Sequence, residues 1–192
     1  MKTLNQYIKE KLIINKDYRE VKIVVKSFYE LRKIIEDRYD KLGEGTEQNP
    51  IDFNDIDVSN IDSFYSNTYY RGIFAETKFK YIDISDWDVS NVTDMKVMFY
   101  NCVVLKSVGD ISKWDVSNVI NMSAMFDSCV VLKSVGDISY WDVSKVSNMS
   151  YMFYCCASFN QDISNWNVSN VKNNDYMFYD CPIKDEYKPK FK

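Results

Sequence analysis

The sequence contains no histidine, and only five of its 192 residues are glycine and three are proline. Without histidine, the chain lacks the commonest general base, the Ser-His and Cys-His nucleophile pairs, and the commonest metal ligand. The scarcity of glycine and proline leaves little room for long flexible linkers. We therefore expect an ordered protein that is not an enzyme and that holds neither a metal nor another cofactor.

Long apolar runs are missing as well. No stretch of about 18 apolar residues is present, as a membrane-spanning helix would need, and the opening segment MKTLNQYIKEKLIINKDY lacks the continuous apolar core of a signal peptide. The net charge of −4 argues against a nucleic-acid binder that relies on a cationic surface. We expect a cytoplasmic protein with neither nucleic acid nor membrane as its partner.

What the sequence does contain is a tandem repeat, marked by Trp87, Trp114, Trp141 and Trp166. The first three tryptophans are 27 residues apart, and the fourth follows after 25. Each is followed by a Met-Phe pair and then by a cysteine, in the order Cys102, Cys129, Cys156 and Cys181. A period of this length predicts stacked units, none of which can bury its apolar face alone.

Within one unit we expect a strand over 105–108, a second extended piece over 111–116 and a helical turn over 119–126, where the apolar residues follow helical spacing. A degenerate first unit begins at Ile56, which stands in the place of tryptophan. The pattern predicts an α/β repeat solenoid of about five rungs that spans residues 51–181.

The residues on either side of the repeats differ from them. In 1–50 we expect a helix around 4–12, a strand over 20–25, and a second helix that begins with a capping box of Ser27 and Glu30 and ends at Gly43. This helix–strand–helix cap would cover the first rung. Residues 182–192 are expected to form a polar, frayed C-terminal tail.

The recurring Trp-Asp-Val-Ser-Asn-Val with Met-x-x-Met-Phe, and the segment Phe159-Asn160-Gln161-Asp162-Ile163, resemble the repeats of BspA-type leucine-rich-repeat proteins over about residues 51–181. The resemblance implies a right-handed, leucine-rich-repeat-like solenoid that recognises other proteins. The chain also resembles short proteins without a secretory leader that gut bacteria and their phages carry. The chain lacks the leader of the family's surface proteins.

Three ladders of repeated residues each allow two interpretations. The four cysteines in register could bind metal or form disulfides, but we favour an inward row of small apolar side chains, with Cys155 as the exposed thiol. The tryptophans could form an exposed ridge, but strand alternation places them with buried valines. The aspartates before Ile-Ser and Val-Ser could bind calcium, but they are typical of residues that cap turns.

A recognition surface should differ between units while the core stays constant. One such row is Lys106, Lys133 and Asn160, with Ser107, Ser134 and Gln161 beside it. A second comprises Asp86, Lys113, Tyr140 and Asn165, and a third comprises Tyr100, Asp127, Tyr154 and Tyr179. Mixed Tyr, Lys, Asn and Asp side chains on a rigid surface suit a protein partner.

These patterns favour a non-catalytic protein-binding repeat module. Its expected site comprises Lys106, Ser107, Lys133, Ser134, Asn160, Gln161, Lys113 and Tyr140. A narrower interpretation, which rests on the resemblance, is a phage or mobile-element protein that engages a host protein such as a defence component. The alternative is a structural component of a virion or surface assembly, and carbohydrate binding through aromatic side chains is a third interpretation.

Overall fold

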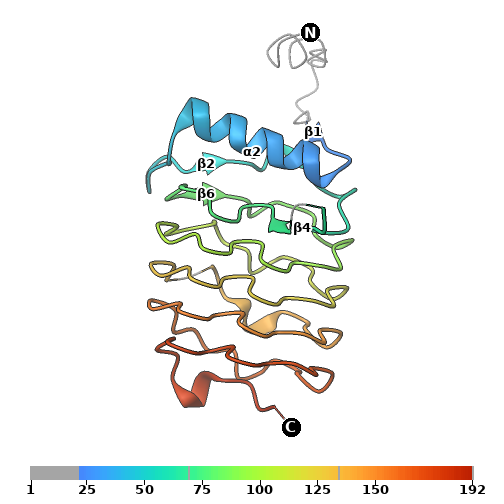
Figure 1. Ribbon diagram of the computed structural model, residues 1–192, viewed down its shortest axis with the longest axis vertical. Coiled ribbons are helices and arrows are strands. Elements are labelled where there is room, and N and C mark those ends of the chain that lie inside the picture. The colour runs from blue at the N-terminus through green and yellow to red at the C-terminus, as the bar shows by residue number, and fades with distance from the viewer. Residues whose placement is uncertain (1–21, 69, 134, 192) are drawn as a thin grey trace.

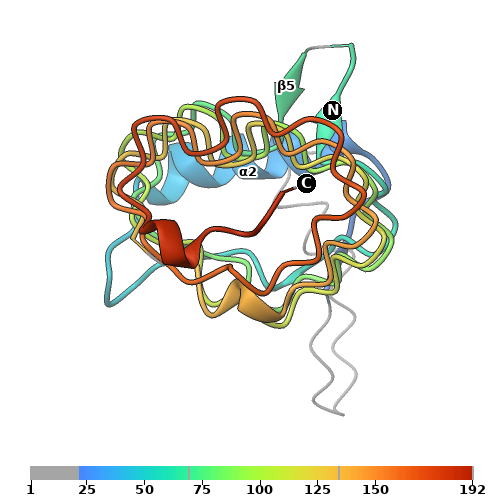
Figure 2. The same ribbon diagram turned by 90° about the horizontal axis from the view of Figure 1, so that it is seen from below.

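The computed structural model describes residues 22–68, 70–133 and 135–191. The chain winds repeatedly around one axis, so that successive repeats lie on top of one another as layers (Figure 1). Seen along this axis, the layers superpose on a closed outline (Figure 2). The helix α2, Phe28–Leu42, lies across one end, and the C-terminal segment crosses the other.

The expected α/β solenoid of leucine-rich-repeat type, right-handed and with about five rungs, is wrong. The described residues contain one α-helix, two 3-10 turns (η1, Ile138–Tyr140, and η2, Asp185–Tyr187) and six strands of two residues each. The strands form three small sheets. β1 (Ile23–Val24) pairs with β3 (Ile56–Asp57) and β2 (Ile51–Asp52) with β6 (Ile82–Asp83), both in parallel, whereas β4 (Tyr65–Ser66) pairs with β5 (Arg71–Gly72) in antiparallel fashion.

Isolated parallel bridges connect successive layers. They join Ser63 to Asp94, Asp94 to Asn121, Asn121 to Asn148 and Asn148 to Asn173, and a further bridge joins Tyr81 to Ser107. The strand expected over 105–108 is thus reduced to one bridge, and no strand forms over 111–116. Most of each layer is irregular backbone.

The segment that follows each bridge alternates between two kinds of hydrogen bond. The amides of Met95, Val97, Phe99 and Asn101 donate to the carbonyls of Asn121, Ser123, Met125 and Asp127 in the next layer, over 2.8–2.9 Å. The intervening amides close tight turns within the layer, as Met98 N does to Met95 O and Tyr100 N to Val97 O. Every second amide therefore holds the next layer, and the others bend the chain.

This alternation explains why the helical turn expected over 119–126 does not form. A helix would direct every amide to its own chain, whereas the amides of Met122, Ala124 and Phe126 cross to the next layer. The turns require a positive φ at positions that are not glycine, such as Val97 (50°) and Ala124 (52°). Such backbone costs on the order of 1–3 kcal/mol per residue, which the bonds between layers offset.

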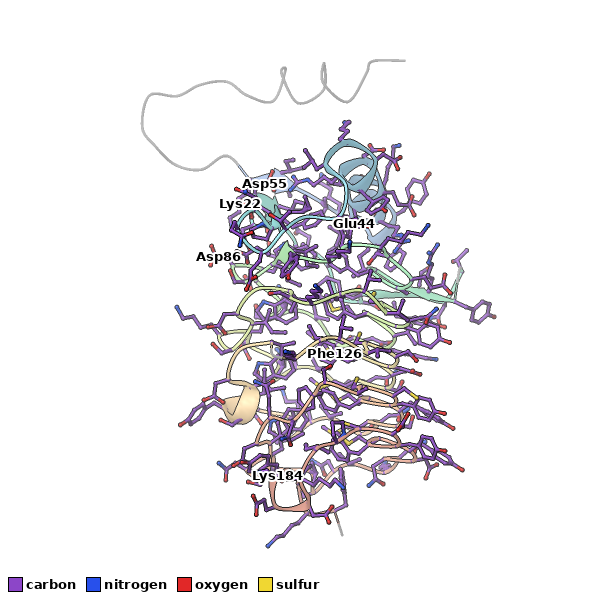
Figure 3. All side chains as sticks on the ribbon, turned by 90° about the vertical axis from the view of Figure 1, so that its left-hand side faces the viewer. Lys22, Glu44, Asp55, Asp86, Phe126 and Lys184 are labelled. Atoms are coloured by element: carbon purple, nitrogen blue, oxygen red, sulfur yellow. The ribbon has the colours of Figure 1, made fainter. Side chains whose placement is uncertain are left out.

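Identical side chains stack into ladders that form the core. The rings of Phe74, Phe99, Phe126, Phe153 and Phe178 stack in sequence with centroids 5.3–5.9 Å apart, and Phe126 lies inside the stack (Figure 3). The expectation that the tryptophans are buried is confirmed, because each is at most 4% exposed. Each indole N–H donates to a carbonyl of the preceding layer, for example Trp141 Nε1 to Ile111 O at 3.2 Å.

The cysteine ladder is also internal, as expected. Cys102, Cys129 and Cys156 are buried, and each Sγ lies 2.9–3.2 Å from a carbonyl oxygen of the phenylalanine in the preceding layer. Burial raises the pKa of each of these thiols. Cys181, in the last layer, is only half-buried, as is Cys155.

The N-terminal end of the stack is covered by α2. The expected N-cap is confirmed, because Glu30 N donates to Ser27 Oγ, but the Glu30 carboxylate accepts from Lys26 N rather than from Ser27 N, so the reciprocal bond of a capping box does not form. Leu31 and Ile35 are fully buried against the first layer. Arg32 donates to Ile73 O at 2.7 Å, a carbonyl at the rim of this layer. The helix expected around 4–12 lies outside the described residues.

The opposite end is partly covered by the C-terminal segment. The expectation of a frayed tail is wrong for residues 182–191, because this segment is bonded to the stack. Ile163 N donates to Tyr187 O at 3.0 Å, and Lys184 N donates to the side-chain oxygen of Asn160. Ile183 and Pro189 are buried. Figure 3 shows Lys184 at this end and Glu44 at the end that α2 covers.

The cysteine arrangement predicts two classes of thiol. In the native protein, a maleimide should modify Cys155 first and Cys181 more slowly, because burial raises the pKa of the Cys181 thiol. Cys102, Cys129 and Cys156 should react only after denaturation. Mass spectrometry of labelled peptides measures this order, Cys155→Ser serves as the control, and rapid native labelling of Cys129 would contradict the buried ladder.

Arg32→Met should lower the free energy of unfolding by about 1–3 kcal/mol, because it leaves the Ile73 carbonyl without its donor while it keeps an apolar stem. Urea unfolding measures the change. Lys33→Met on the exposed face of the same helix is the matched control and should change stability little. Equal losses for the two variants would show that Arg32 does not secure this end.

Candidate binding surfaces

A groove with a volume of about 680 Å³ brings together part of the predicted site. Lys106, Ser107 and Lys133 line it, from neighbouring layers. Sequence reasoning missed the other walls, which are Glu47, Pro50, Tyr81, Ile82, Asp83, Gly109, Val131 and Ser158. The groove therefore runs along the stack, from the loop after α2 across several layers.

Local sequence positions the two lysines. Lys106 follows buried Leu105 and Lys133 follows buried Leu132, so both side chains are exposed. Lys106 N donates to Lys80 O at 2.7 Å, which ties the segment to the preceding layer, and Lys106 Nζ lies 5.7 Å from the centre of the Tyr81 ring. Lys80 itself forms an ion pair with Glu44 at 2.5 Å. No ion pair joins Lys106 or Lys133 to another described residue.

Two units require glycine at the same position, and one of these glycines, Gly109, lines the groove. Gly109 and Gly136 have φ values of 83° and 91°. A Cβ atom at Gly109 would lie 2.4 Å from Asp83 Oδ1, and one at Gly136 would lie 1.8 Å from Asp110 Oδ1. Glycine is therefore needed both for the backbone angle and for the close approach of the preceding layer.

Several residues of the predicted site are engaged by hydrogen bonds within the protein or lie outside the groove. Ser134 lies outside the described residues. Ser107 Oγ accepts from Gly109 N at 3.1 Å, Gln161 Nε2 donates to Gly136 O at 2.8 Å, and Asn160 accepts from Lys184 N. Lys113 and Tyr140 are exposed but do not line the groove.

A second surface comprises four tyrosines of the last two layers. Tyr151 stacks on Tyr176 with ring centres 5.2 Å apart, and Tyr154 stacks on Tyr179 at 5.1 Å. Tyr151, Tyr176 and Tyr179 are 38–59% exposed. The sequence analysis identified Tyr154 and Tyr179 as members of a variable row but missed Tyr151 and Tyr176. The row Val97, Ala124, Tyr151 and Tyr176 also varies, so the same criterion applied one row further would have found them.

Asp127 belongs to the same row as Tyr154 and Tyr179, but it is buried rather than presented to a partner. Its carboxylate accepts from Ser128 Oγ at 2.7 Å, and burial raises its pKa. The buried charge destabilises the fold above that pKa, and the effect disappears as the pH falls below the ordinary value for an aspartate.

The expectation that the laddered aspartates cap turns is confirmed. In every described unit the carboxylate accepts from the amide two residues later, as in Asp110 with Ser112 N at 3.0 Å and Asp115 with Ser117 N at 3.0 Å. Hydrogen bonds from these serines lower the pKa of both carboxyl groups. Over the described residues, no group of three or more Cys, Asp or Glu side chains is arranged to hold a metal ion.

Asp127→Asn should raise the Tm at pH 7 by roughly 2–4 °C, a typical shift for a favourable change in a chain of this size. The gain should shrink as the pH is lowered toward 3.8, the ordinary value, because the wild-type carboxyl group then loses its charge. Asp115→Asn is the control, in which the amide oxygen can still accept from Ser117 N. Thermal melts from pH 3 to pH 7 measure both. A lower Tm for Asp127→Asn at pH 7 would contradict a net cost of this buried charge.

Within the described part of the chain, no helix combines the length and the apolar character needed to cross a bilayer.

Comparisons with known proteins identify one family. No curated protein and no solved structure matches the sequence. A family model described as "Mycoplasma protein of unknown function, DUF285" matches residues 67–188, which cover the full repeats, the four tyrosines, most of the groove lining and most of the C-terminal segment. The chain therefore belongs to this DUF285 family.

Proposed function

We propose that this protein is a non-catalytic protein-binding module and that the groove lined by Lys106 and Lys133 holds an acidic segment of its partner. The observation that carries the proposal is the pairing of two exposed lysines, without ion pairs among the described residues, in one elongated hollow. Acidic side chains of such a segment would face the two lysines, and its uncharged or basic side chains would face Glu47 and Asp83, which line the same hollow. The net charge of −4 disfavours a long polyanion such as nucleic acid, whereas a short acidic segment can be confined to the two lysines.

The repeat architecture supports binding rather than chemistry. The chain lacks histidine, its turn aspartates are occupied by hydrogen bonds, and its laddered thiols are buried with raised pKa values. The resemblance to BspA-type repeats also implies recognition of another protein. We accordingly propose a cytoplasmic role, and in its narrower form a phage or mobile-element protein that engages a host protein such as a defence component.

The test is a charge reversal in the groove. Lys106→Glu combined with Lys133→Glu should leave the fold intact and abolish capture of the partner, because two like-charge contacts cost several kcal/mol at a complementary interface. Wild-type and variant protein serve as baits in a lysate of the host bacterium. Quantitative mass spectrometry then identifies proteins that the wild type enriches and the variant does not.

The control variant reverses the charge of two lysines outside the groove. Lys172→Glu combined with Lys190→Glu reverses two exposed lysines that do not line it. Loss of the partner by the control but not by the groove variant would place the site elsewhere, and loss by neither would disprove the role of the groove.

A further inference from the structure

The last layer presents a row of backbone amides that the preceding layers would use to hold a successor. In the layer before it, the amides of Met149, Tyr151, Phe153 and Cys155 donate to the carbonyls of Asn173, Asp175, Met177 and Tyr179 over 2.8–2.9 Å. The corresponding amides of the last layer belong to Asn174, Tyr176, Phe178 and Asp180. Within the described residues, none of these four amides has a hydrogen-bond acceptor.

The side chains at this edge are also less buried than their counterparts in the preceding layers. Phe178, the last ring of the phenylalanine ladder, is half-buried, whereas Phe126 and Phe153 are 1% exposed. A hollow of about 350 Å³ separates the edge from the C-terminal segment, and it is lined by Asn174, Tyr176, Met177, Phe178, Tyr179, Lys188, Pro189 and Phe191. The C-terminal segment thus runs beside the amide row without pairing with it (Figure 2).

The chemistry of the two ends excludes a second copy of the chain as the natural occupant. Two such edges placed together would bring amide donors against amide donors. Head-to-tail stacking would need the carbonyls of the first layer, but those of Ile73 and Ala75 already accept from Arg32 beneath α2. An occupant must therefore be a segment that presents carbonyl oxygens at alternate residues, in the turning backbone that each layer adopts.

We propose that this edge, formed by residues 174–180, binds a segment of a partner protein that adopts the turning backbone of a layer and carries aromatic side chains three residues apart. Tyr151 and Tyr154 occupy such positions in the layer above, and their rings stack on Tyr176 and Tyr179 at 5.2 and 5.1 Å. The outer faces of Tyr176 and Tyr179, which are 59% and 56% exposed, offer the same stacking to the next chain. An apolar residue between the two aromatics would enter the hollow over Phe178.

Two synthetic peptides that copy this chain's own layers serve as probes. The peptide of residues 146–156 carries tyrosines at both stacking positions, and that of residues 119–129 carries alanine and aspartate there. The first should bind saturably and about tenfold more tightly than the second, because it adds two aromatic contacts. Under reducing conditions, hydrogen exchange of the full-length protein should slow by roughly tenfold at residues 174, 176, 178 and 180 when peptide 146–156 is bound.

Proline substitutions test whether the backbone amides of this row donate to the bound peptide. Asn174→Pro removes one amide of the row and should weaken binding of peptide 146–156 by roughly two- to tenfold. Asp185→Pro is the matched control, because it places proline at the first position of the 3-10 turn η2 and should bind as the wild type does. If Asn174→Pro does not fold, the exchange pattern of the wild type decides the question.

The outcomes separate this site from the groove. The combined Lys106→Glu and Lys133→Glu variant should bind the peptide normally, so failure of one proposal leaves the other standing. Absence of saturable binding at millimolar peptide, or protection at the groove instead of residues 174–180, would overturn the inference. Concentration-dependent dimerisation that protects the same four amides without peptide would overturn it in favour of a second copy.

Discussion

The hydrogen bond from every second amide to the next layer is the interaction on which this structure depends. It fixes the spacing at which the phenylalanine rings stack, 5.3–5.9 Å between centres, and it sets the register of the buried cysteines and tryptophans. Side chains then reinforce the contact between layers, because each indole and thiol donates to a carbonyl of the preceding layer. Backbone and core therefore hold the same pairs of layers together.

The sequence was sufficient to predict which residues are buried but not how the backbone carries them. Val119, Met122, Met125 and Phe126 follow the spacing of a helix, and all four are buried as a helix would place them. The same spacing also arises when tight turns alternate with residues that cross to the next layer. Positive φ values at Ala124 and Tyr151 distinguish this turning backbone from a helix. Alanine and tyrosine rarely adopt a positive φ, so the sequence could not predict it.

The surface residues, like the core, were predicted only in part. The outward position of Lys106 and Lys133 followed from their place after buried leucines, because a side chain next to a core position points away from the core. The wall that Glu47 and Pro50 add to the groove could not be predicted, since it depends on where the loop after α2 meets the second and third layers. Ser107, Asn160 and Gln161 shared the variable pattern of a recognition row, yet hydrogen bonds within the protein engage each of them.

The change from 27 to 25 residues in the last complete unit is confined to the segment that contains Gly109 and Gly136 in the longer units. There the shorter unit places Gln161, whose side-chain amide reaches the Gly136 carbonyl of the layer above. The tryptophan and phenylalanine ladders continue across this change, with ring centres 6.3 Å apart for Trp141 and Trp166 and 5.6 Å for Phe126 and Phe153. The perimeter of a layer can thus lengthen or shorten at one loop at little cost to folding while the interior stays constant, and in one unit this loop carries Gly109, a residue of the groove.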